Sequence, residues 1–321
     1  MPTVEIIEPG LSTTVQDRGR FGHYHLGIPQ GGAMDAMSAA AGNALVGNTP
    51  DDAVLECTYL GPNLRFTEDT IVAVTGAPVT VSIDGTEVPE WTQIDVPAGS
   101  VLSFGIIAGG SRFYIAVRGG IDVPVVLGSR STYPAGRLGG HEGRALQKDD
   151  VLPVGTATNP LPEQATTPEN LRPGFTREQN IRIVMGLYDQ KLTETGRDNI
   201  TGGEWMLTPV ADRAGLRFKG PGVEWKDEPQ PFGAGADPSN IVDAGYAVGS
   251  IQIPGGTQPI VLHRDAVSGG GYAMVGTVIS ADMDLVARLA PGTKIHFVEV
   301  TMDEALAARE VYREQLAALW V

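Results

Sequence analysis

Residues 128–144, GSRSTYPAGRLGGHEGR, gather side chains that could stabilise a negative charge. Three are arginines, Arg130, Arg137 and Arg144, and five are glycines that keep the backbone open. Hydroxyl and imidazole groups are added by Ser129, Ser131, Thr132, Tyr133 and His141. Guanidinium groups bind carboxylate, phosphate or bicarbonate through paired hydrogen bonds. The segment is therefore a candidate anion site on a loop, and the alternative is a solvated loop whose arginines form structural ion pairs.

Two histidines separated by one residue, His23 and His25, form the kind of pair that can bind a metal ion from one face of a strand. A mononuclear metal site needs a third and usually a fourth ligand. The nearest downstream acids, Asp35 and Asp51, lie beyond a Gly/Pro turn, and no glutamate follows closely. We expect no bound metal and interpret the imidazoles as structural or substrate-contacting groups.

The segment GIPQGGAM, residues 27–34, precedes a predicted helix that Asp35 would cap. Backbone N–H groups of Gly31 and Gly32 could face an anion there. A tight turn that requires positive φ explains the two glycines equally well. The segment lacks the Lys-Ser/Thr of a P-loop and the βαβ context of a dinucleotide site.

A second Gly-rich segment, DAVSGGGY at residues 265–272, carries Asp265, Ser268 and Tyr272. Gln252 and Gln258 flank a Pro-Gly-Gly turn just before it. In Gln16-Asp17-Arg18 and Asp212-Arg213, a carboxylate and a guanidinium are neighbours in sequence. We expect each of these charged groups to pair elsewhere in the fold, since neighbours on a strand point apart.

Composition excludes several classes of partner. The chain of 321 residues has a net charge of −15 and no basic tract, so we expect neither a nucleic-acid partner nor an anionic membrane surface. The single cysteine, Cys57, allows no disulfide framework. The N-terminus has no basic and apolar leader pattern, and no apolar run reaches about 18 residues. We therefore expect a cytoplasmic protein without a membrane span.

Short apolar strand patterns with frequent turn signals predict a mainly β fold with a few helices. A helix is predicted at 37–46, and a capping box at Thr301 and Glu304 predicts a C-terminal helix. Leu-Arg-Phe at 64–66 recurs at 216–218, followed by four further short matches in the same order, which suggests two tandem β modules. The predicted domains are an N-terminal segment with the first module (1–155), a Pro/Thr-rich linker (156–180), the second module (181–300) and the C-terminal helix (301–321).

Several blocks of this sequence resemble the biotin-dependent carboxyltransferase-like family. They span about residues 4–305 and include TTVQDRGRFG, HLGIPQGGAMD, GGIDVPVVLGSRSTY, LGGHEGRAL, GSIQIPGGTQPIVL and GGGYAMVGTVISAD. The family contains allophanate hydrolase subunit 2, the carboxyltransferase region of urea amidolyase and urea carboxylase, an antagonist of a sporulation kinase inhibitor, and the C subunit of 5-oxoprolinase. The resemblance implies cyclophilin-like β-barrel architecture for both modules.

The resemblance implies three functional hypotheses. The leading one is the C subunit of a prokaryotic 5-oxoprolinase, a hydrolase that opens the cyclic amide of 5-oxo-L-proline to L-glutamate. ATP would act through the complex with two partners, the lactam hydrolase (A) and the cyclophilin-like protein (B). The second is a carboxyltransferase or allophanate hydrolase subunit 2 of a urea-degrading system, which alone would involve biotin. The third is a non-catalytic regulator of a kinase inhibitor. The absence of a fused biotin carboxylase, carrier or amidase region favours the first.

The sequence departs from the family pattern in one block. Many members have a sequence close to DRQTTGGY where this chain has Asp265–Tyr272, so the arginine after the aspartate is missing and Arg264 stands before it. We assign site residues by loop. The predicted catalytic residues are Arg130, Tyr133, Arg137, His141, Asp265 and Tyr272. The predicted residues for binding a small amide or lactam substrate are His25, Gln30, Gly31, Gly32, Asp35, Gln252, Gln258 and Ser268.

Overall fold

The computed structural model describes residues 2–320, which divide into two compact units. Unit 1 comprises the described residues up to Phe21, Gly31–Phe175, and those from Gln315 onward. Unit 2 comprises Gly22–Gln30 and Thr176–Glu314. Within residues 2–320, no helix combines the length and apolar character needed to cross a membrane. This division assigns the first half of the HLGIPQGGAMD motif to unit 2 and the second half to unit 1.

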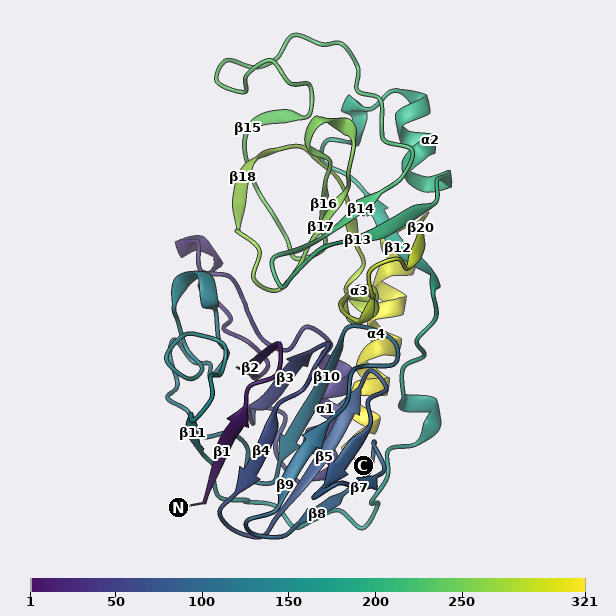
Figure 1. The fold of residues 1–321 in the computed structure, drawn as a ribbon. Coiled ribbons are helices and arrows are strands. Elements are labelled where there is room, and N and C mark those ends of the chain that lie inside the picture. The colour runs from purple at the N-terminus through teal and green to yellow at the C-terminus, as the bar shows by residue number, and fades with distance from the viewer. Residues whose placement is uncertain (1, 321) are drawn as a thin grey trace. The chain divides into compact units, whose positions relative to one another are not determined.

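Unit 1 consists of two antiparallel sheets and one helix, α1 (Figure 1). The strands of the six-stranded sheet, in spatial order, are β11 (Val151–Pro153), β1 (Thr3–Glu8), β4 (Asn63–Phe66), β9 (Val101–Phe104), β6 (Val81–Ile83) and β7 (Thr86–Val88). Those of the five-stranded sheet are β2 (Ser12–Gln16), β3 (Val54–Thr58), β10 (Arg112–Val117), β5 (Thr70–Gly76) and β8 (Ile94–Val96). Short 3-10 turns are η2 (Pro134–Gly136) and η3 (Glu169–Leu171).

Strand β10 shows how the sequence builds this unit, because all six of its residues are buried. Phe113, Ile115 and Val117 join the main apolar core, whereas Tyr114 and Ala116 join a second cluster. Alternate side chains of a strand point to opposite faces, so β10 is covered on both sides. Helix α1 (Ala36–Leu45) covers the second face and packs on β5 and β10.

Unit 2 is organised around a closed barrel. Its strands, in order, are β12 (Glu178–Met185), β19 (Met274–Val278), β16 (Ser250–Gln252), β17 (Ile260–Leu262), β14 (Gly215–Lys219), β13 (Trp205–Ala211) and β20 (Lys294–Glu299). The pairing of β12 with β20 is parallel, and the other pairings are antiparallel. Inward-facing apolar residues fill the barrel, and the Phe218 and Phe297 rings meet edge to face at 6.1 Å.

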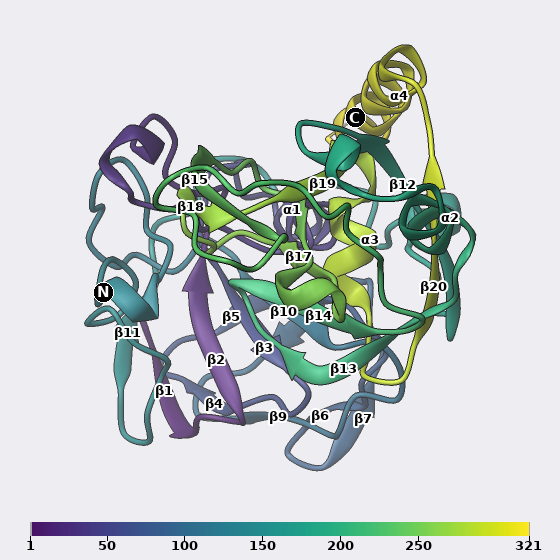
Figure 2. The same cartoon turned by 90° about the horizontal axis from the view of Figure 1, so that it is seen from above.

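The remaining elements of unit 2 surround the barrel. They are a two-stranded ribbon of β15 (Asn240–Gly245) and β18 (Gly269–Tyr272), the helices α2 (Glu194–Gly202) and α3 (Met283–Arg288), and the turns η1 (Tyr24–Leu26), η4 (Asp189–Lys191), η5 (Pro254–Gly256) and η6 (Ser280–Asp282). Helix α2 lies beside β20 (Figure 2). Helix α4 (Met302–Ala318) begins in unit 2, and its residues from Gln315 belong to unit 1.

The mainly β prediction is confirmed, and the described residues contain four α-helices. The prediction of two tandem barrels is not confirmed. Unit 2 contains a closed barrel, but the strands of unit 1 form two separate sheets. The repeat also changes its pairing, because β4 and β9 are direct neighbours whereas the corresponding β14 and β16 are separated by β17. The units divide after Phe175, within the predicted linker 156–180, but Gly22–Gln30 of the predicted first domain belong to unit 2.

Both predicted helix signals are present in the structure. The Asp35 carboxylate accepts the Ser38 N–H at 3.1 Å and the Ser38 hydroxyl at 2.6 Å, which caps α1 as expected. At the start of α4, Thr301 and Glu304 form the reciprocal bonds of a capping box, at 2.8 and 3.2 Å. Residues 302–318 are helical, within the predicted 301–321 segment, whose last residue lies outside the described residues.

Candidate functional site

Unit 2 contains a cavity of about 600 Å³, which is within the range of ligand-binding pockets. Its walls are strands β12 and β19, helix α3 and the first part of α4. Most of the lining is apolar and includes Val184, Met185, Val248, Met274, Val278, Met283, Met302 and Leu306. The polar lining groups are Gln30, Arg264, Thr277, Ser280 and Arg309. We call this space the unit 2 cavity.

Arg264 is the charged group of the cavity with the fewest partners. Its guanidinium forms no ion pair or side-chain hydrogen bond with any described residue, and its Nε atom is buried without a partner. Buried polar atoms are bonded in the great majority of cases. A partly buried guanidinium left open toward a cavity is therefore available to an anion.

The turn that carries Arg264 is held firmly on both sides. The imidazole of His263, fully buried, accepts the Arg264 backbone N–H on Nδ1 at 3.0 Å, which leaves Nε2 to donate to the Met283 carbonyl at 3.1 Å. Asp265 accepts two hydrogen bonds from Arg213, at 2.8 and 2.9 Å, in a nearly buried ion pair. The backbone on either side of Arg264 is thus fixed by His263 and by the Arg213–Asp265 pair, none of which lines the cavity.

Tyr24 and Gln30 reach the same region from the N-terminal segment of unit 2. Gln30 lines the cavity, and the Tyr24 hydroxyl is buried without a hydrogen-bond partner in the described structure. Burial raises the pKa of Tyr24, and the nearby positive charge of Arg264 opposes that rise. The Tyr24 hydroxyl and the Arg264 guanidinium, neither of which has a side-chain partner among the described residues, are therefore close enough to interact electrostatically.

A fourth polar group comes from α4. The Arg309 Nε is buried without a hydrogen bond, although this guanidinium approaches the Glu310 carboxylate at 3.6 Å. With 43% of its side chain exposed, Arg309 lies where the cavity meets solvent. It adds a second positive charge to a lining that is mostly methionine and aliphatic side chains.

The predicted arginine loop, residues 128–144, lies in unit 1 and is fastened to the end of β2 by Asp17. That carboxylate accepts hydrogen bonds from the hydroxyls of Ser129 and Ser131 and from the backbone N–H groups of Gly19 and Arg130. A single acidic side chain thus holds three consecutive loop residues. The sequence signal for it was the Gln16-Asp17-Arg18 triplet, whose charged groups pair elsewhere as expected, Arg18 with Asp51 at 3.2 Å.

Within this loop, two of the four predicted site residues, Arg130 and His141, have side-chain partners. Arg130 pairs with Asp122 at 2.7 Å and donates to the Val123 carbonyl. Arg144 makes bonds of 2.7 to 2.9 Å to Asp150 and Glu142, and His141 approaches Asp150 at 3.4 Å. These contacts match the ion-paired alternative.

Arg137 differs from the other two arginines of the loop. It is exposed, adopts a left-handed backbone conformation (φ 49°) and has no side-chain partner among the described residues. Tyr133, beside it, is half-buried and exchanges backbone hydrogen bonds with Leu138. Arg137 is therefore the guanidinium of this loop that is open to a ligand.

The GIPQGGAMD turn has a structural explanation at Gly32. Its φ is +88°, and a Cβ there would lie 2.8 Å from the carbonyl carbon of Arg18, so only glycine fits. Gly31 also has positive φ, at 63°. Asp35 is fully buried and engaged by Ser38, as the N-cap requires. These three predicted substrate-binding residues have the contacts of a helix-start turn.

The other predicted residues also lie in unit 2, but they do not line the cavity. Tyr272 is 44% exposed on β18, and its backbone N–H and C=O both bond to the Tyr246 hydroxyl at 2.8 Å. Ser268 accepts the Tyr246 N–H through its carbonyl. Gln252 is buried in β16, Gln258 is half-buried, and His25 is exposed in η1. Within residues 2–320, no three His, Cys, Asp or Glu side chains come together as a metal site.

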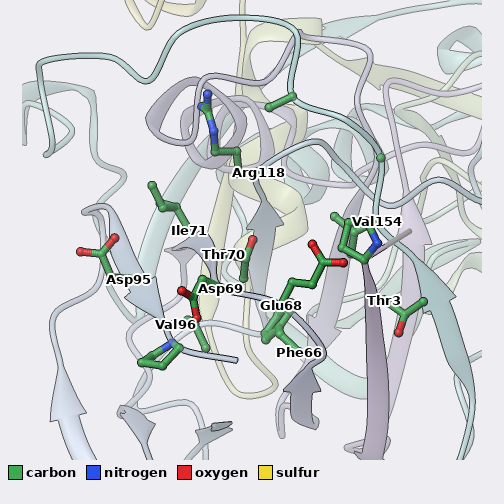
Figure 3. A pocket seen from close by; sticks show the side chains of 14 residues that line it. Thr3, Phe66, Glu68, Asp69, Thr70, Ile71, Asp95, Val96, Arg118 and Val154 are labelled. Atoms are coloured by element: carbon green, nitrogen blue, oxygen red, sulfur yellow. The ribbon is translucent and has the colours of Figure 1, made fainter. Parts of the chain in front are cut away.

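Unit 1 has a cavity of comparable size, about 590 Å³, with an acidic lining (Figure 3). Glu68, Asp69 and Asp95 are exposed carboxylates there. The one cation of the lining, Arg118, donates instead to the carbonyls of Val46 and Asn159, both at 2.8 Å. Among the described residues, none that lines this cavity has a buried side-chain nitrogen or oxygen without a hydrogen bond, in contrast to the unit 2 cavity.

The sequence did not indicate Arg309 or the methionines as members of a common cavity, nor Tyr24 as a neighbour of Arg264. Met185, Met274, Met283 and Met302 come from four separate elements, and methionine alone carries no spacing signal. Arg309 lies in the predicted C-terminal helix, for which the sequence carries no ligand-binding signal. Two lining residues were indicated by the sequence: Gln30 as a predicted substrate-binding residue, and Arg264 through the missing arginine in DAVSGGGY.

Comparison with known proteins agrees with the observed architecture. Residues 26–299 match the model of the carboxyltransferase domain, subdomain A and B. The chain is 34% identical to the C subunit of Escherichia coli 5-oxoprolinase, covering 98% of this chain and 97% of that protein. It is 33% identical to urea amidolyase of Saccharomyces cerevisiae, covering 96% of this chain but only 17% of that protein. The crystal structure of Kluyveromyces lactis urea amidolyase superimposes with a TM-score of 0.93 at 32% identity, covering 99% of this chain and 20% of that one. The chain belongs to the family of the carboxyltransferase domain, subdomain A and B.

Proposed function

We propose that this protein is the C subunit of a 5-oxoprolinase complex, which hydrolyses the cyclic amide of 5-oxo-L-proline to L-glutamate at the expense of ATP. One observation supports it above the others: the alignment with the Escherichia coli protein covers 97% of that protein, so nearly all of its length has a counterpart here. The Haemophilus influenzae protein of the same name gives a similar alignment, at 32% identity over 97% of its length.

In this proposal the chain works together with two partner proteins, the lactam hydrolase and the cyclophilin-like partner. ATP acts through the assembled complex in this proposal; the chain itself has no Gly-rich loop ending in Lys-Ser/Thr. Opening the lactam places negative charge on the former amide oxygen, and guanidinium groups stabilise such charge. Arg137 in unit 1 and Arg264 in unit 2 are the open guanidinium groups described above.

Reconstitution tests the proposal directly. The chain is combined with the purified lactam hydrolase and cyclophilin-like partner, and ATP-dependent release of glutamate from 5-oxo-L-proline is measured, with each component omitted in turn. The Escherichia coli protein with its own partners serves as the positive control. We expect turnover only with all three proteins and ATP. Absence of glutamate release from an assembled complex, beside an active control, contradicts the proposal.

A second candidate is supported by the TM-score of 0.93 to urea amidolyase. In that case the chain would act as the carboxyltransferase part of a urea-degrading system and accept a carboxyl group from carboxybiotin. The same reconstitution includes an arm with urea, a biotinylated carrier, biotin carboxylase, ATP and bicarbonate. Carboxylation of urea that requires this chain, without glutamate release in the first arm, would favour this second function.

A further inference from the structure

We propose that the unit 2 cavity is a carboxylate-binding site in which Arg264 anchors the anion and the apolar walls hold the body of an organic acid. The inference deepens the proposed function and rests on it in one respect: 5-oxo-L-proline, the proposed substrate, is such an acid. The carboxylate site itself is argued from the cavity alone.

The first argument is the distribution of charge. The chain carries 38 acidic and 23 basic residues, so a guanidinium has many carboxylates to pair with. Other arginines of unit 2 do so: Arg182 binds Asp282 at 2.6 Å, and Arg197 binds Glu299 at 2.7 Å. Arg264 is next to an aspartate in sequence, yet both oxygens of that carboxylate accept from Arg213. The aspartate next to Arg264 in sequence is therefore already paired, and the Arg264 guanidinium lines the cavity without a counter-ion among the described residues.

The second argument is the desolvation of the neighbouring polar atoms. The Arg264 Nε and the Tyr24 hydroxyl are both buried and without partners in the described structure. A buried donor without a partner costs free energy that a bound anion recovers. Hydrogen bonds between a guanidinium and a carboxylate are among the strongest in proteins, and they favour a planar anion with two oxygens. An unpaired donor set of this kind points to a ligand that supplies the acceptor.

The third argument is the apolar composition of the cavity lining. Four methionines, at 185, 274, 283 and 302, line the cavity together with aliphatic side chains. Methionine is flexible and polarisable, and it adapts to ligands of different shape. Such walls favour an organic monoanion with an apolar body over inorganic phosphate, whose larger charge would lose more hydration against apolar side chains. The polar groups Gln30, Thr277 and Ser280 leave room for one amide or hydroxyl on that body.

Calorimetric titration of the full chain tests the site with matched pairs of probes. 5-Oxo-L-proline is compared with its neutral amide, 5-oxo-L-prolinamide, and hexanoate with hexanamide; inorganic phosphate is a further probe. We expect at least one of the two carboxylates to bind, with its amide weaker by about tenfold or more, because the amide lacks the charge that Arg264 pairs with. Phosphate should not compete.

Variants separate the role of Arg264 from a general effect on the fold. Arg264→Gln should weaken carboxylate binding by about tenfold or more, and Arg264→Lys should weaken it less. Arg313→Gln, on the same unit but paired with Glu310 and outside the cavity lining, should leave binding unchanged. Val248→Phe, which keeps Arg264 and fills the cavity, should weaken binding as well. Circular dichroism checks that each variant is folded. If Arg264→Gln does not fold, Arg264→Lys and Val248→Phe still test the site.

The outcomes distinguish this inference from the proposed function. Binding of 5-oxo-L-proline that depends on Arg264, without turnover in the reconstituted complex, supports the site and contradicts the proposed function. Binding of hexanoate alone supports the site and shows that its ligand is not the lactam. Carboxylates that do not bind, amides that bind equally well, phosphate that competes, or an Arg264→Gln variant that behaves like Arg313→Gln would overturn the carboxylate site, even if the complex releases glutamate.

Discussion

Asp265 forms its ion pair with Arg213 and not with Arg264, its neighbour in sequence. Both oxygens of the carboxylate are used, and the side chains of the pair are 7% and 13% exposed. The pair closes the turn that begins at His263, whose imidazole binds the Arg264 backbone. Two adjacent residues therefore do different things: Asp265 fixes the turn, and Arg264 faces the unit 2 cavity.

The Arg213–Asp265 pair predicts a large loss of stability when one partner is removed. Arg213→Ala leaves the Asp265 carboxylate buried without its counter-charge. Breaking a buried pair in this way costs about 3–5 kcal/mol. We expect a loss of this size in the free energy of unfolding of the full chain, measured by urea denaturation.

Lys294→Ala is the matched control for that experiment. Lys294 pairs with Glu204 in the same unit at a similar distance, 2.9 Å, but both side chains are almost half exposed. Exposed ion pairs contribute little, because water and salt screen them. If Arg213→Ala proves as mild as Lys294→Ala, the Asp265 turn is not held by this pair.

Two tyrosines of unit 2 predict opposite responses to the loss of one oxygen. The Tyr24 hydroxyl is buried without a partner in the described structure, and its removal relieves that cost, so Tyr24→Phe should raise the free energy of unfolding by up to about 1–3 kcal/mol. The Tyr246 hydroxyl bonds to both backbone groups of Tyr272, so Tyr246→Phe should cost about 1–3 kcal/mol. Thermal denaturation of the two variants, side by side, compares them. Equal losses would mean that the Tyr24 hydroxyl does have a partner in the folded chain.

The parts of the fold that depend on local sequence were predictable. The N-cap at Asp35 and the capping box at Thr301 and Glu304 involve residues three apart, and both are present. Closure of a barrel depends on pairing between distant strands, for which the sequence gives only periodicity. The Leu-Arg-Phe repeat accordingly marks a strand in each unit, β4 and β14, but their sheets close differently.

The candidate site was predictable only in part, for a related reason. Loop segments rich in Gly and Arg stand out in the sequence, and the structure describes 128–144 as a loop. Which of its arginines is free depends on distant carboxylates: Asp122 engages Arg130, whereas no described residue engages the side chain of Arg137. The unit 2 cavity combines Gln30, Arg264 and Arg309, which are far apart in sequence, and no local pattern brings them together.

The capping box of α4 predicts a pH dependence. Hydrogen bonds from the Thr301 backbone N–H and hydroxyl lower the pKa of Glu304 below its ordinary value of 4.5. A carboxyl group whose pKa is lowered by folding stabilises the fold above its unfolded pKa, and this contribution disappears as the pH falls through the lower folded pKa. We expect the amide protection of the first turn of α4 to be greater in wild type than in Glu304→Gln at neutral pH, and the difference to vanish in acid below pH 4.5.

Asp303→Asn is the control for this pH effect, since Asp303 lies in the same helical turn but forms no capping bond to Thr301. It should show the wild-type pH dependence. A Glu304→Gln difference that persists unchanged in acid would show that the carboxylate charge has no part in the cap.

The arginine loop predicts a separation between stability and activity. Asp17 holds the loop through Ser129, Ser131 and the backbone of residue 130, so Arg130→Ala should leave the loop in place. In the reconstituted complex we expect Arg137→Ala, which removes the loop guanidinium that is unpaired among the described residues, to lower turnover about tenfold or more while the chain stays folded. Arg130→Ala removes a guanidinium that is already paired with Asp122, so it should retain more turnover than Arg137→Ala. Equal losses in the two variants would mean that the charge of Arg137 has no role of its own. Wild-type turnover of Arg137→Ala would show that this guanidinium does not meet the substrate.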